Sequence, residues 1–133
     1  MRIDEGLLEM LMEQARKSPR LRMNYDMRTS PADTSQRMLN ALEPGTQVPV
    51  HRHRHSTECV VVLRGKGVQY YYDDAGNVTD EIVLEADGPC RMMSVEMGRW
   101  HRFESLESGT VIYESKDGAY EPFAPEDILL IEK

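Results

Sequence analysis

The chain has 133 residues and a mass of 15.3 kDa, which predicts one domain around one packed core. Its formal net charge is −7, from 16 lysines and arginines against 23 aspartates and glutamates, so neither a nucleic acid nor an anionic membrane is expected as a partner. The N-terminus lacks the basic region and apolar core of a secretory signal, and no apolar run is long enough to cross a membrane. We therefore expect a cytoplasmic protein.

An amphipathic helix is predicted from Asp4 to Lys17. Leucine, methionine and alanine recur there at three- and four-residue spacing, with charged residues on the other side. Ser18 and Pro19 end the helix, because the residue before a proline is pushed out of helical geometry. The apolar face of this helix is expected to pack against its own domain.

After Pro19 the sequence consists of short segments bounded by turn residues, which is typical of an all-β domain. The predicted strands cover residues 36–42, 48–55, 58–63, 68–73, 78–84, 91–96, 100–106, 110–116 and, as a closing strand or a tail docked on a neighbouring subunit, 128–131. Their regular spacing favours a sandwich or a small barrel. We expect a helix and linker at 1–25, the barrel at 26–120 and a C-terminal tail or closing strand at 121–133.

Three of the four histidines lie within five residues of each other, at positions 51, 53 and 55. On a strand, side chains two residues apart share a face, so His51 and His53 are expected to reach one ion. Glu58 begins the next predicted strand, and His101 follows the turn at Gly98. Three imidazoles and a carboxylate suit a divalent metal such as iron, zinc, manganese or nickel. His55 is expected to be solvated or to support the ligands.

The segment from Gly45 to Gly65 resembles the first signature motif of the cupin superfamily. That motif runs glycine, five residues, His-x-His, three or four residues, glutamate, six residues, glycine, and every position matches here. The second cupin motif is half preserved, with Gly98 and His101 in place. The resemblance implies a single-domain, all-β cupin, a double-stranded β-helix or jelly roll with an N-terminal helix, whose metal ligands are His51, His53, Glu58 and His101.

Residues 15–24, 36–46, 98–101 and 114–120 make the chain similar to the WbuC family of cupin-fold metalloproteins. That resemblance implies a metal-binding protein found beside genes for bacterial surface polysaccharide (O-antigen) synthesis. Arg22, Asn24, Tyr113 and Lys116 are candidate substrate-binding residues because they lie in or directly beside these family-like segments.

The function that we expect is a metal-dependent enzyme, such as an isomerase or epimerase, acting on a small polar molecule, a sugar or sugar-nucleotide. Two alternatives stay open at this point. One is an iron-dependent dioxygenase, because open iron sites with few protein ligands support oxygen chemistry. The other is a non-catalytic metal- or ligand-binding accessory or sensor module. Exposed sheet edges and the apolar run Ile128 to Ile131 predict a homodimer.

Overall fold

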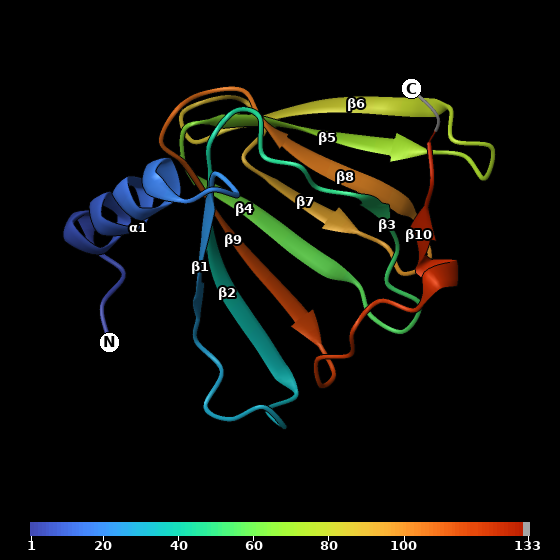
Figure 1. Cartoon of the computed structure of the whole chain (residues 1–133), viewed down its shortest axis with the longest axis horizontal. Coiled ribbons are helices and arrows are strands. Elements are labelled where there is room, and N and C mark those ends of the chain that lie inside the picture. Colours follow the sequence, from blue (N-terminus) through green and yellow to red (C-terminus); the bar gives the residue numbers. More distant parts are fainter. Residues whose placement is uncertain (132–133) are drawn as a thin grey trace.

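The computed structural model describes residues 1–131 and contains two antiparallel sheets with one helix outside them (Figure 1). One sheet has the strand order β1-β2-β9-β4-β7 and the other has the order β10-β3-β8-β5-β6. The helices and strands are α1 Glu5–Lys17, β1 Arg22–Asp26, β2 Ser35–Leu42, β3 Val50–His51, β4 Glu58–Arg64, β5 Lys66–Tyr72, β6 Val78–Glu85, β7 Met92–Val95, β8 Trp100–Ser105, β9 Thr110–Asp117, the short 3-10 helix η1 Pro125–Asp127 and β10 Ile128–Leu129.

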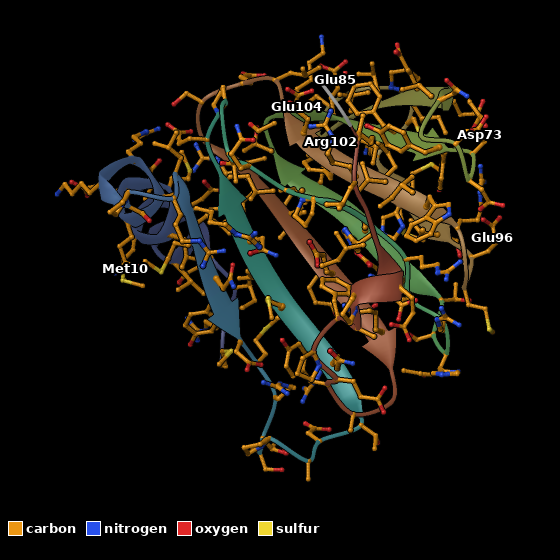
Figure 2. All side chains as sticks on the ribbon, turned by 45° about the vertical axis from the view of Figure 1, so that its right-hand side comes forward. Met10, Asp73, Glu85, Glu96, Arg102 and Glu104 are labelled. Carbon is orange, nitrogen blue, oxygen red and sulfur yellow. The ribbon has the colours of Figure 1, made fainter. Side chains whose placement is uncertain are left out.

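Helix α1 covers the outer face of the first sheet, as the sequence predicts. Asp4 caps it by accepting a hydrogen bond from the backbone N–H of Leu7, at 3.0 Å. Its apolar side packs on β1, β2 and β9, whereas Met10 on the opposite side is exposed (Figure 2). The buried residues of this outer cluster are Leu8, Leu11, Met12, Ala15, Leu39, Ala41 and Val111.

A second cluster of buried apolar residues fills one end of the space between the sheets. Its members come from five strands, β2, β4, β6, β8 and β9: Leu42, Val60, Val62, Leu84, Phe103 and Ile112. Two residues earlier on several of these strands, on the same face, the side chains are polar. Asn40 precedes Leu42 in this way, Glu58 precedes Val60 and His101 precedes Phe103. One end of the interior is therefore an apolar core, and the other end is polar.

Three features differ from the sequence-based prediction. Strand β1 was not predicted, although polar Arg22 and Asn24 alternate there with apolar Met23 and Tyr25. The strand expected at 48–55 shrinks to β3, because Pro49 has no N–H for a ladder and the chain then bends away. The C-terminal segment, for which two placements were open, pairs through β10 with β3 of the same chain.

Within residues 1–131, α1 is the longest helix, and no helix has the length and apolar character needed to cross a membrane.

Candidate metal centre

The four predicted ligands come together at the polar end of the interior. His51 ends β3 and lies opposite His101 of β8 in the strand register. His53 follows in the loop after β3, and Glu58 is the first residue of β4. One ligand atom from each of the four residues lies within 4.8 Å of all the others. The cluster therefore has the dimensions of a site for a single ion.

The backbone holds the second and fourth of these residues together. Gly98 adopts a φ of +83°, which favours glycine, and this places the turn before β8. Its N–H donates a hydrogen bond of 2.8 Å to the carbonyl oxygen of His53. The turn that leads to His101 thus also anchors the loop that carries His53, which is why these residues converge without sharing a strand.

Hydrogen bonds to the backbone orient two of the imidazole rings. His51 Nδ1 lies 2.8 Å from the carbonyl oxygen of Pro49, and His101 Nδ1 lies 2.8 Å from that of Arg99. Since a carbonyl only accepts, Nδ1 carries the hydrogen and Nε2 of the neutral ring keeps its lone pair. Metal-binding histidines are commonly fixed in this manner.

The nitrogen atoms that face the cluster lack hydrogen-bond partners. Among residues 1–131, His53 Nε2 and His101 Nε2 are buried without a hydrogen-bond partner. His53 Nε2 lies 2.8 Å from Glu58 Oε2, and His101 Nε2 lies 3.7 Å from the same oxygen. Buried polar atoms normally have partners. These unpaired nitrogens, together with one carboxylate, form a donor set that fits a divalent cation.

The charges of the cluster also suit a cation. Burial, with a smaller contribution from the neighbouring His101, lowers the pKa of His51 to about 3. Burial alone would raise the pKa of Glu58, but the imidazoles of His101 and His53 outweigh this effect and hold that pKa well below its usual range. At neutral pH the cluster therefore presents a neutral His51 imidazole and an ionised Glu58 carboxylate.

The cluster forms part of the wall of a cavity of about 530 Å³ between the sheets, a volume that suits a small ligand. Of the candidate substrate-binding residues, Arg22, Asn24 and Lys116 line this cavity. Tyr113 does not: it neighbours the cavity-facing Glu114 on β9, so it points to the other side of the sheet and packs against the outer cluster under α1.

His55 takes no part in the cluster. It is exposed and borders a shallower hollow beside the C-terminal segment. The neighbouring Arg52 packs over the ring of Trp100, with 4.3 Å from its guanidinium carbon to the ring centroid, and both Arg52 and Arg54 form ion pairs with Asp127. Through these ion pairs the two arginines hold η1 against the loop after β3.

Several cavity residues were missed by sequence reasoning. Gln69, Asn40 and Glu114 line the cavity as single polar residues on the inward face of strands. Phe123 lies over the cluster, with ring centroids 4.8 Å from His51 and 5.6 Å from His53. Asn40 and Gln69 stand among apolar neighbours on their strands, which was a usable signal for these two, whereas Glu114 begins a polar run at the end of β9. Nothing in the local sequence pattern indicates the position of Phe123.

Solved structures with this fold include other cupins. The capsular polysaccharide assembling protein CapF from Staphylococcus aureus is similar with a TM-score of 0.65 at 22% identity, over 83% of this chain and 32% of that chain. KdgF from Halomonas sp. has a TM-score of 0.60 at 12% identity, over 77% of this chain and 84% of that chain. The cupin domain of Schizosaccharomyces pombe Cnp3 has a TM-score of 0.58 at 12% identity, over 73% and 64% of the two chains.

These likenesses establish the cupin fold, and the chain spans about a third of the CapF chain. No curated protein matches the sequence. Residues 3–84, more than half of the chain, match the family model described as a domain of unknown function, DUF6016. The chain belongs to the DUF6016 family and has the cupin fold.

Proposed function

We propose that this protein is a metal-dependent enzyme that acts on a small polar molecule, a sugar or sugar-nucleotide of bacterial surface polysaccharide synthesis. The observation that carries the proposal is the placement of His51, His53, Glu58 and His101 in the wall of a polar cavity. A divalent ion bound there would polarise a carbonyl or hydroxyl oxygen or lower the pKa of water. The protein's own part is to hold that ion and to orient the substrate beside it.

The cavity also contains a carboxyl group able to exchange a proton near neutral pH. Burial, with a smaller contribution from Glu58, raises the pKa of Glu114 to about 7. Glu114 Oε1 accepts a hydrogen bond of 3.1 Å from the amide of Asn40, which fixes its orientation. We assign to Glu114 the task of holding or moving a proton, because acid–base catalysis works best when the pKa lies near the working pH.

Access to the cluster is restricted by the C-terminal segment. Tyr120 and Phe123 line the cavity, and Phe123 packs on the rings of His51 and His53. Excluding water in this way strengthens electrostatic interactions within a site. The segment therefore favours chemistry on an enclosed substrate over a permanently open ion-binding surface.

The polysaccharide context has two supports. The sequence is similar to the WbuC family, which is found beside O-antigen genes. The fold is similar to that of a protein described as a capsular polysaccharide assembling protein. We further propose that the protein forms a homodimer, which sedimentation analysis would test.

The first experiment is elemental analysis of protein purified without added metal. We expect close to one transition-metal ion per chain, retained in His55→Ala and lost in His53→Ala, since only the latter removes a ligand. Both variants should keep the circular dichroism of the wild type. A wild-type protein with no bound metal, or equal loss in the two variants, would contradict the proposed centre.

The second experiment tests turnover. A panel of nucleotide sugars is incubated with the metal-loaded protein in D₂O, and hydrogen exchange or isomerisation is followed by NMR. Activity should require both the metal and Glu114, so that Glu114→Gln retains the ion but loses most of the rate. Metal binding without turnover of any nucleotide sugar would instead support the accessory or sensor function.

A further inference from the structure

The cavity is cationic although the protein is acidic. Five of the residues that line it are cationic and three are acidic, whereas the whole chain has a formal net charge of −7. Of the three acids, Glu58 belongs to the metal cluster and Asp26 is paired with Arg28 at 2.7 Å. Arg37 is paired with Asp33 at 2.9 Å, so the lining cations outside these pairs are Arg20, Arg22 and Lys116. Positive charge concentrated in a recess favours an anionic ligand.

Arg22 is a cavity cation with a buried hydrogen-bond donor that is not used. It lies on the cavity-facing side of β1, and its Nε atom is buried without a hydrogen-bond partner among residues 1–131. Its Nη2 atom makes a long hydrogen bond of 3.5 Å to Asn40 Oδ1. A guanidinium keeps its charge in proteins and presents a planar set of donors that matches a carboxylate or phosphate.

Gln69, on β5 of the other sheet, also has buried hydrogen-bonding groups that are not used, and these groups are uncharged. It lines the cavity and is only 1% exposed, yet neither its amide nitrogen nor its amide oxygen has a hydrogen-bond partner in the described part of the chain. Leaving such groups unpaired is costly. A donor and an acceptor held side by side complement a hydroxyl group, which both accepts and donates.

We propose that the substrate is an anionic, hydroxyl-bearing small molecule whose carboxylate or phosphate group pairs with the fork of Arg22, while Gln69 hydrogen-bonds one of its hydroxyl groups. This proposal deepens the function proposed above and rests on it. Arg22 and Gln69 belong to different sheets. A molecule that contacts both therefore spans the cavity that the metal cluster also lines.

The test is calorimetry with three probes that share one sugar ring: glucose, glucuronate and glucose 1-phosphate. We expect at least one of the two anions to bind the wild type about tenfold or more tightly than glucose, since charge-assisted hydrogen bonds are worth about 1.5–3 kcal/mol. Comparison of the two anions distinguishes a carboxylate from a phosphate ligand. Arg22→Gln should abolish the preference, and Gln69→Leu should weaken all binding that the wild type shows.

Arg64→Gln is the matched control, because it removes the same charge from an arginine that pairs with Glu5 and Glu9 of α1 outside the cavity. Retention of the preference in Arg22→Gln, its equal loss in Arg64→Gln, or failure of both anions to bind would overturn the proposal. Repeating the titrations after a chelator has removed the metal tests the proposed anion site separately from the proposed metal-dependent function. A preference that depends on Arg22 supports the anion site even if no metal is found, and metal binding without the preference leaves only the proposed function standing.

Discussion

The same strands form both ends of the interior, but one end stabilises the fold and the other holds polar groups that lack partners. Leu42, Val60 and Phe103 pack in the apolar end and border the cavity, and Asn40, Glu58 and His101, two residues away on the same strands, line its polar part. At the apolar end, burial of side chains stabilises the fold. At the polar end, Gln69, His53 and His101 carry atoms without protein partners, which costs stability.

This difference indicates that stability and function are divided along each strand. The apolar end and the cluster under α1 stabilise the sheets. The polar end can therefore keep polar groups that are available to a ligand, although this costs stability. Substitutions at the two ends should therefore have separable effects, and some should act in opposite directions.

The largest effect on stability is expected from Leu84→Ala at the apolar end. Leu84 is fully buried and does not line the cavity. Truncating it should lower the free energy of unfolding by about 2–5 kcal/mol, through lost burial and the space left behind. Denaturant titration measures the loss, and metal analysis of the folded variant should give the wild-type content. Loss of the metal in the folded variant would show that the two ends are not separable.

A second effect concerns pH at the polar end of the metal-free protein. The pKa of His51 is about 3 in the folded chain, against 6.5 as its ordinary value. Between these values the unfolded chain binds a proton that the folded chain does not, so stability falls as the pH drops below about 6.5. Glu114 acts in the opposite sense. Its pKa is raised from 4.5 to about 7 in the folded chain, so the folded chain binds a proton that the unfolded chain does not, and stability falls as the pH rises through this range.

The contribution of His51 is isolated by comparison with His51→Gln. Denaturation midpoints of the two metal-free proteins should diverge on acidification, with the wild type losing more stability. Parallel curves would mean that the neutral imidazole has no part in the acid sensitivity.

Gln69→Leu should shift stability by a smaller amount and in the favourable direction. Replacing a buried, unpaired amide by an apolar side chain of similar size should raise the free energy of unfolding by about 1 kcal/mol. Asn40→Leu is the matched comparison and should destabilise, because Asn40 is hydrogen-bonded to Glu114 and Arg22. If both variants lose stability equally, Gln69 is not an unsatisfied group in the free protein.

The smallest effect on stability is expected from Asp127→Asn. Asp127 pairs with Arg52 and Arg54 and so holds the segment that carries Phe123 over the histidines. The loss should be small, since the ion pairs are near the surface and screened by solvent. Chelators should nevertheless extract the metal faster than from the wild type. Glu13→Gln, which breaks the surface pair with Lys17, should leave the extraction rate unchanged.

Sequence reasoning predicted the cupin fold, the helix and the four clustered residues, but one of its premises was wrong. His51 and His53 were expected to converge because they share a strand, whereas β3 ends at His51. They converge because the N–H of Gly98 anchors the loop carbonyl of His53. The spacing of the motif is compatible with a loop as well as with a strand. The correct residues were therefore identified from an incorrect local geometry.

The sequence by itself determined what depends on spacing along the chain: the amphipathic helix, the succession of short strands and the set of candidate ligands. The tertiary structure decided what depends on distant segments meeting. Arg22, Asn40 and Gln69 share a cavity only because β1, β2 and β5 belong to facing sheets, and Phe123 reaches the histidines only because β10 pairs with β3. Alternation along a strand assigns a side chain to a face, but the pairing of strands selects what that face meets.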